Sequence, residues 1–147
     1  MDSKTSNIRS IISSEGAPAA IGAYSQGVRI NYGNFSVLNL SGQIGMDPST
    51  GDLVSDDVED QTRRALTSVK NLLEDNGSSF DKIIKATLFL VDMGDFSKVD
   101  NIYKTFFTTK DVPARAAVAV ASLPKGAKFE IIVEAICDED YEFIDKK

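Results

Sequence analysis

The chain of 147 residues contains no histidine and no tryptophan, and it has a single cysteine, Cys137. Histidine is the commonest general base and metal ligand, so its absence excludes a Ser-His-Asp triad, a Cys-His pair and a histidine-rich metal site. One cysteine excludes an intrachain disulfide, and the favoured interpretation of Cys137 is a small apolar residue at a strand end. Any catalysis must therefore use carboxylates, Tyr, Lys, Arg, backbone groups or water.

The sequence also lacks an apolar run near the roughly 20 residues that a membrane helix needs. Its first residues, MDSKTSNIRS, lack the apolar centre of a secretory signal. Positive charge is in the minority, with 16 Lys+Arg against 22 Asp+Glu and a net charge of -6. Because this average field repels a phosphate backbone, neither nucleic acid nor a membrane is an expected partner. The sequence favours a cytoplasmic location and leaves the mitochondrion open.

What is present is an ordinary globular composition, 42% hydrophobic and 26% charged, which predicts one domain over residues 1–147. Residues 1–7 are predicted to form a flexible start, and residues 138–147 an acidic, solvated tail. Between them the patterns predict the order β-β-β-α-β-α-β-β. The expected strands are 8–12, 24–30, 35–41 and 83–91, plus two within 112–135 that are joined by a turn at 124–126; the expected helices are 56–76, with Asp56 as a capping residue, and one capped by Asp95.

These elements predict an α+β fold built on one mixed sheet. Strand-helix-strand crossovers are right-handed, which places both helices on the same face of the sheet. The last strand alternates so that Phe129 and Ile131 point to one face while Ile132 and Ile136 point to the other. Both faces therefore carry large aliphatic groups, and the uncovered face predicts an oligomer.

Two charged residues stand out within residues 112–135. Arg115 is followed by a row of alanines that leaves room beside it, and Glu130 lies in an apolar run. A cation and a carboxylate on neighbouring strands suggest a site for a small anionic ligand. The pattern leaves open that Arg115 reaches solvent or pairs with an acid, and that Lys128 or Arg115 neutralises Glu130. Glu134 is an equally good candidate acid by pattern.

Four stretches together resemble the Rid family of reactive-intermediate deaminases, also called the YjgF or L-PSP endoribonuclease family. They are APAAIGAYSQG (17–27), SGQIGMDPSTG (41–51), DFSKVDNIYKTFF (95–107) and PARAAVAVASLPKGAKFEI (113–131). The resemblance implies a chorismate-mutase-like α+β fold (bacillar type) and a homotrimer with active sites between subunits. It also implies hydrolysis of enamines and imines, such as 2-iminobutanoate and 2-iminopropanoate, to 2-oxo acids and ammonia. Neither a metal nor an organic cofactor is implied.

The same resemblance suggests roles for individual residues. Arg115 matches the arginine that clamps the substrate carboxylate, and Glu130 matches the acid that holds the attacking water. Tyr24 and Ser41 match a tyrosine and a serine of the substrate pocket. We expect Arg115 and Glu130 to be catalytic, and Tyr24 and Ser41 to bind substrate.

Two further expected substrate-binding positions depart from the family pattern. Asp100 stands where the deaminases usually have asparagine, and Ala117 where active members often have cysteine. An added negative charge at Asp100 is unfavourable for an anionic substrate. These departures keep two alternatives open: a non-catalytic trimer that binds small carboxylates such as 2-oxo acids, and a translation inhibitor or endoribonuclease.

Overall fold

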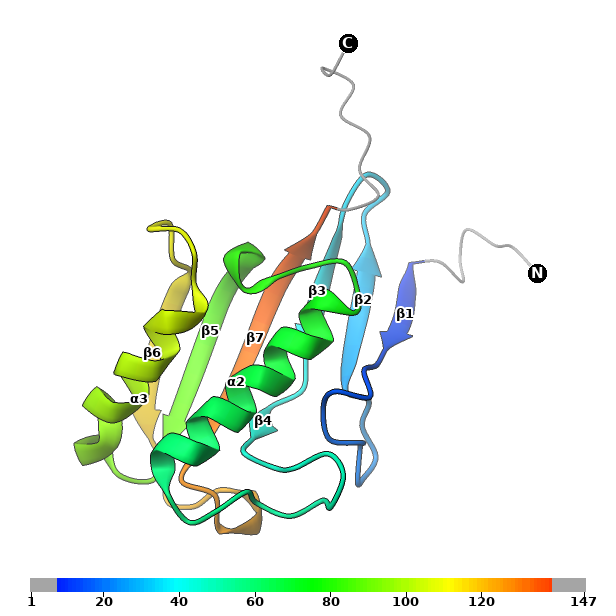
Figure 1. Cartoon of the computed structure of the whole chain (residues 1–147). Coiled ribbons are helices and arrows are strands. Elements are labelled where there is room, and N and C mark those ends of the chain that lie inside the picture. Colours follow the sequence, from blue (N-terminus) through cyan, green and yellow to red (C-terminus); the bar gives the residue numbers. More distant parts are fainter. Residues whose placement is uncertain (1–7, 139–147) are drawn as a thin grey trace.

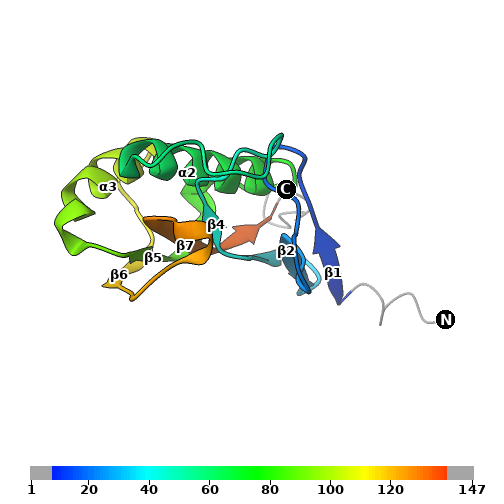
Figure 2. The same ribbon diagram turned by 90° about the horizontal axis from the view of Figure 1, so that it is seen from below.

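The computed structural model describes residues 8–138, so the predictions for residues 1–7 and for the tail after Asp138 lie outside it (Figure 1). A seven-stranded mixed sheet has the order β1-β2-β3-β7-β5-β6, and the short β4 pairs with β7. The two α-helices within residues 8–138 cover the same face of the sheet, as predicted (Figure 2). The elements are β1 (Arg9–Ile12), β2 (Gly27–Asn31), β3 (Ser36–Leu40), β4 (Gln43–Ile44), α2 (Val58–Glu74), β5 (Ile83–Leu90), α3 (Phe96–Tyr103), β6 (Ala114–Ala119) and β7 (Phe129–Cys137).

The core lies between this sheet and α2. The helix forms because its apolar residues recur with the helical period and all face the sheet. Leu66, Val69 and Leu72 are fully buried, as are Leu88 and Phe129 on the strands below. Over residues 8–138, neither helix combines the length and the apolar character needed to cross a bilayer.

The predicted helix caps were wrong in detail. Asp57, rather than Asp56, caps α2, and its side chain accepts a hydrogen bond from the backbone N–H of Asp60. Asp95 precedes α3 but makes no side-chain capping bond, because it already belongs to the short helical turn η2 (Met93–Asp95). Neither difference changes where the helices lie, because packing of their apolar faces on the sheet determines their position.

The predicted hairpin between β6 and β7 is wrong, since β5 lies between these two strands. β6 pairs with β5 in parallel after the α3 crossover, and β7 pairs with the other side of β5 in the antiparallel sense. The connecting residues 120–128 pass over the end of β5, where the N–H of Val120 donates to Leu90 and that of Val91 donates to Lys128. Arg115 and Glu130 are therefore not on neighbouring strands.

The face of the sheet away from the helices carries large aliphatic groups, as the alternation predicted, beside the polar residues Lys85, Thr87, Glu130 and Glu134. Ile132 and Val118 on this face are 40% and 43% exposed. We call this surface the open-face patch; by strand register it comprises Val28, Ile30, Val37, Phe89, Val118, Ile132 and Ile136. Nothing within residues 8–138 covers it, which is unusual for a surface of this apolar character.

Candidate functional site

One cavity of about 350 Å³ lies at the end of the sheet where α2 begins. It brings together Tyr24, Ser41 and Glu130, three of the six residues predicted to form the site. The other lining residues are Pro18, Ile21, Gly42, Gln43, Ile44, Met46, Pro124 and Lys125. We call this space the Glu130 cavity.

Glu130 supplies the only carboxylate that lines this cavity. It lies on β7 beside Ile44 of β4 and points away from the helices. The side chain is half-buried, and this burial raises the pKa of its carboxyl above the usual value. The two ion pairs among residues 8–138 do not involve Glu130, so the alternative that Lys128 or Arg115 pairs with it is not found within the described residues. A partly desolvated carboxylate that forms no ion pair among the described residues is suited to accept a proton or to orient water.

The surroundings of the two side chains distinguish Glu134 from Glu130. The two acids share one face of β7, so alternation could not distinguish them. Glu134 lies opposite Asn39 on one side and Lys85 on the other, and it does not line the cavity. Glu130 is therefore the better candidate acid.

The wall that carries Tyr24 and Ser41 is a loop rather than a strand. The predicted strand 24–30 begins only at Gly27, because the N–H of Tyr24 closes a turn onto Gly22. Buried Gln26 holds this wall: its amide donates to the carbonyls of Ala17 and Pro18, at 3.2 and 2.8 Å. Ser41, just past the end of β3, donates its hydroxyl to the carbonyl of Ser25 at 2.6 Å.

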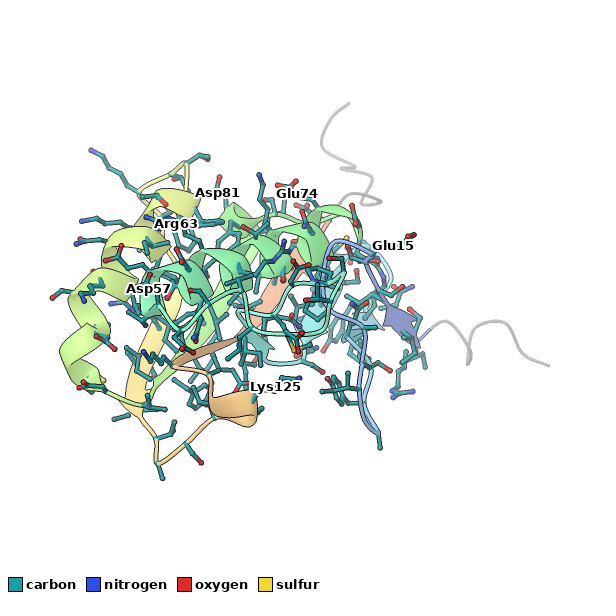
Figure 3. All side chains as sticks on the ribbon, turned by 60° about the horizontal axis from the view of Figure 1, so that its bottom comes forward. Glu15, Asp57, Arg63, Glu74, Asp81 and Lys125 are labelled. Atoms are coloured by element: carbon teal, nitrogen blue, oxygen red, sulfur yellow. The ribbon has the colours of Figure 1, made fainter. Side chains whose placement is uncertain are left out.

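Sequence reasoning missed Lys125 as a residue of this cavity. Lys125 adopts a left-handed backbone conformation, with φ 59° and ψ 17°, which is uncommon for a residue other than glycine. Figure 3 labels it on the turn before β7, at the end of the molecule away from Glu74 and Asp81. The Pro-Lys-Gly pattern predicted the turn, but only the fold shows that this turn borders the cavity.

Gly42 lies against the Glu130 carboxylate and gives the first prediction. A Cβ built on Gly42 would approach Oε2 of Glu130 far below van der Waals distance. Gly42→Ala should therefore displace the carboxylate, while the fold tolerates the change because only the end of a flexible side chain must move. We expect kcat/KM for imine hydrolysis, the reaction that the resemblance implies, to fall by about 10- to 10²-fold, with the free energy of unfolding changed by less than about 1 kcal/mol.

The matched control for Gly42→Ala is Gly22→Ala. A Cβ at Gly22 would meet the Tyr24 ring at an ordinary 3.6 Å. Steady-state kinetics and thermal unfolding of both variants make the comparison. Equal activity of the two variants would contradict the importance of the Gly42–Glu130 contact.

The remaining predicted site residues lie elsewhere, around Arg115. Arg115 is level with buried Ala86 in the strand register, so its side chain points to the helix-covered face, opposite to Glu130. Nη1 of Arg115 donates to Oδ1 of Asp100 at 2.5 Å. Ala117 shares the face of Arg115 and packs against the core. A single chain thus divides the predicted site into two groups that do not meet.

Two aromatic rings of α3 flank the Arg115 guanidinium. Its central carbon lies 5.2 Å from the ring centroid of Phe96 and 5.1 Å from that of Tyr103, within the range of cation–π attraction. The Tyr103 hydroxyl is buried and has no hydrogen-bond partner among the described residues. Burial is the main cause that raises the pKa of Tyr103; nearby Arg115 lowers this pKa, and Asp100 raises it further. The helical period predicted both rings only as part of an apolar stripe.

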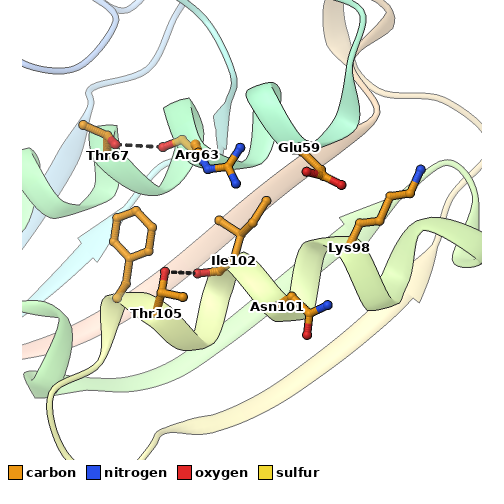
Figure 4. Close-up of a pocket in the computed structure, with 8 residues that line it drawn as sticks. Glu59, Arg63, Thr67, Lys98, Asn101, Ile102 and Thr105 are labelled. Carbon is orange, nitrogen blue, oxygen red and sulfur yellow. Dashed lines mark hydrogen bonds between the residues drawn. The ribbon is translucent and has the colours of Figure 1, made fainter.

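A larger cavity of about 450 Å³ lies between α2 and α3 and contains none of the predicted site residues (Figure 4). Its charged lining residues are Glu59, Arg63 and Lys98, with Arg63 and Lys98 exposed to solvent. Thr67 and Thr105 in its wall donate their hydroxyls to helix carbonyls, at 2.7 and 2.6 Å. This groove therefore offers solvated charges, in contrast to the half-buried acid of the Glu130 cavity.

Comparison with known proteins gives consistent matches. A rat protein named 2-iminobutanoate/2-iminopropanoate deaminase is 46% identical over 132 residues, which cover 90% of this chain and 93% of the rat protein. The crystal structure of YyfA from Yersinia pestis, a member of the Rid protein family, matches with a TM-score of 0.79 and 42% identity over 86% of this chain and 98% of that chain. Escherichia coli TdcF, crystallised with bound serine, matches with a TM-score of 0.75 and 40% identity over the same shares.

The family profile described as "Endoribonuclease L-PSP" matches residues 14–137, which include the Glu130 cavity and the surroundings of Arg115. The α+β fold with its mixed sheet and two helices agrees with the structures of this family. The chain belongs to the endoribonuclease L-PSP family, the family of the Rid proteins.

Proposed function

We propose that this protein is an enzyme that hydrolyses reactive 2-imino acids, such as 2-iminobutanoate and 2-iminopropanoate, to 2-oxo acids and ammonia. The observation that carries the proposal is the half-buried Glu130 carboxylate, which lines a cavity with Ser41 and Tyr24 and forms no ion pair within residues 8–138. Relatives that match 90% of the chain are named for this activity.

The chemistry needs only groups that this chain contains. Arg115 holds the substrate carboxylate through paired, charge-assisted hydrogen bonds and so orients the imine carbon. Glu130 accepts a proton from water as the water oxygen bonds to that carbon, and the electron pair of the C=N bond moves to nitrogen. Glu130 then returns this proton to the nitrogen of the carbinolamine. The C–N bond breaks and ammonia leaves, while the hydroxyl oxygen forms the C=O bond and releases its proton to the departing ammonia, giving ammonium. Tyr24 and Ser41 contact the substrate from the cavity wall.

We further propose that Arg115 of one chain acts with Glu130 of another. The two side chains lie on opposite faces of the sheet with β5 between their strands, so one chain cannot bring them to one substrate. The open-face patch offers the apolar surface for an oligomer, and a homotrimer with active sites between subunits satisfies both requirements. Light scattering should then give a mass of three chains.

Mixing two inactive variants tests the shared site directly. Arg115→Ala and Glu130→Gln chains should each be inactive alone. When they are co-expressed with separable tags and isolated as mixed oligomers, some sites combine the intact Arg115 of one chain with the intact Glu130 of another. Each mixed trimer contains one such site among its three, so we expect about a third of wild-type turnover. Mixed oligomers without activity would contradict the shared site.

The reaction itself is tested with imine generated in place. A threonine dehydratase supplies 2-iminobutanoate, and the rate of ketoacid release is followed with and without this protein. Acceleration that is proportional to protein concentration is the expected result, and release at the uncatalysed rate would overturn the proposal.

The Arg115–Asp100 ion pair favours a second candidate, a non-catalytic trimer that binds small carboxylates. The pair occupies one edge of the guanidinium, and Ala117 lacks the thiol often found at its position. TdcF with bound serine is an example of a similar structure that holds a small carboxylate. Binding of 2-oxobutanoate without any acceleration of imine hydrolysis would select this candidate.

A further inference from the structure

Helix α3 presents a stripe of three residues to Arg115. Phe96, Asp100 and Tyr103 are spaced four and three residues apart, so they lie on one side of the helix. The two rings flank the guanidinium at 5.2 and 5.1 Å, and Oδ1 of Asp100 accepts from Nη1 at 2.5 Å. The guanidinium is thus held in place before any ligand arrives.

This arrangement changes the charge that a ligand meets. The Asp100 and Arg115 side chains are 34% and 30% exposed, so their charges are only partly screened by water. Asp100 takes Nη1 of the guanidinium, while Nη2 and Nε, which make no hydrogen bond within residues 8–138, remain for a ligand carboxylate. A ligand that binds there places a second carboxylate close to Asp100. The repulsion between them is relieved only if the ligand also carries a cation near its carboxylate.

We propose that Asp100 is a specificity-determining residue that selects ligands with a cationic nitrogen beside the carboxylate and disfavours 2-oxo acid anions. The inference rests on the proposed function, because it takes Arg115 as the carboxylate clamp. The favoured ligands are 2-imino acids in the iminium form and 2-amino acids, both of which carry no net charge.

This selectivity for a cationic nitrogen distinguishes the substrate of the proposed reaction from its product. The iminium substrate has a positive nitrogen and a negative carboxylate. After water has added and ammonia has left, the 2-oxo acid keeps the carboxylate alone. Asp100 pairs with the substrate nitrogen and repels the product, so it assists release of the 2-oxo acid.

A purely structural role for Asp100 makes a different prediction. If Asp100 only fixes the position of Arg115, an asparagine in its place keeps the hydrogen bond through its side-chain carbonyl. Affinity for every carboxylate would then stay the same or weaken together. A charge-based role predicts that affinities for the two ligand classes change in different directions.

The test measures binding of 2-oxobutanoate and L-serine to the full-length wild type and to Asp100→Asn by calorimetry. We expect Asp100→Asn to bind 2-oxobutanoate about tenfold more tightly and L-serine no more tightly, with the difference shrinking at high salt. Inhibition of imine hydrolysis by 2-oxobutanoate should strengthen by the same factor. Asp95→Asn is the matched control, since Asp95 directly precedes the same helix and is in neither of the two ion pairs found within residues 8–138, and it should leave both affinities unchanged.

Two outcomes would overturn the proposal. One is an unchanged ratio of the two dissociation constants in Asp100→Asn, and the other is a wild type that binds 2-oxobutanoate as tightly as L-serine. Either can occur while the wild type hydrolyses imines, in which case the proposed function stands and only the role of Asp100 fails. Failure of the proposed function is read separately, as release of 2-oxo acid at the uncatalysed rate.

Discussion

Replacing Arg115 by alanine is expected to lower kcat/KM for imine hydrolysis by about 10²- to 10⁴-fold. Each charge-assisted hydrogen bond to a carboxylate contributes on the order of 1.5–3 kcal/mol, and the guanidinium can make two. The side chain lies on the edge strand β6 and is 30% exposed, so its loss leaves no buried cavity. The free energy of unfolding should therefore change by no more than about 1 kcal/mol.

Arg115→Lys should also fail to support turnover, because a point charge cannot reproduce the planar fork of donors. Arg63→Ala is the control, since Arg63 is exposed in the α2–α3 groove and outside the Glu130 cavity. Steady-state kinetics and thermal unfolding of the three variants provide the measurement. Turnover close to that of the wild type in either Arg115 variant would reject Arg115 as the carboxylate clamp.

Replacing Glu130 by glutamine should lower kcat by about 10²- to 10⁴-fold, the usual contribution of a positioned proton acceptor. The same change should make the protein more stable at neutral pH. Burial raises the pKa of Glu130 in the folded state, so the folded protein binds a proton more readily than the unfolded chain does. The free energy of unfolding contributed by Glu130 therefore falls as pH rises from the ordinary glutamate pKa through the raised value.

Glutamine does not ionise, so the Glu130→Gln variant does not lose this free energy of unfolding as pH rises. Its melting temperature should therefore exceed that of the wild type at neutral pH and equal it at pH values below the ordinary glutamate pKa. Glu134→Gln is the matched control, because Glu134 shares the same face of β7 but lies outside the cavity. Thermal melts of the three proteins between acidic and neutral pH measure the effect. A Glu130→Gln variant that retains turnover would remove Glu130 from the mechanism, and one that is less stable at neutral pH would contradict its desolvation.

The sequence predicted the fold best in those elements whose buried residues recur at a regular spacing. The stripe of α2 and the two-residue alternation of β7 predicted which residues meet the core, because one face of each element must leave water. Tyr24 was misplaced on a strand because the turn at Gly22 has no strong local signal. β4 was missed because two residues carry no periodicity, and only pairing with β7 makes them a strand.

The site was harder to predict, since it depends on which strands become neighbours. The Pro124–Gly126 turn has the chemistry of a hairpin, yet parallel pairing of β6 with β5 moves β7 to the far side of β5. The strand pattern therefore predicted Arg115 and Glu130 on neighbouring strands, and the fold separates them, whereas the family resemblance implied active sites between subunits. The pairing of Arg115 with Asp100 also depends on how α3 packs over β6, which no local pattern records.

The contact between Gly42 and Glu130 has a consequence for how this family can diverge. A side chain at residue 42 and a glutamate at residue 130 would occupy the same space. A relative with alanine at the first position therefore needs either a glutamate that is turned away from residue 42 or a shorter side chain, such as aspartate, at the second. Residues 42 and 130 are therefore expected to co-vary among relatives. Replacement of the glycine also changes where the carboxylate at residue 130 can lie.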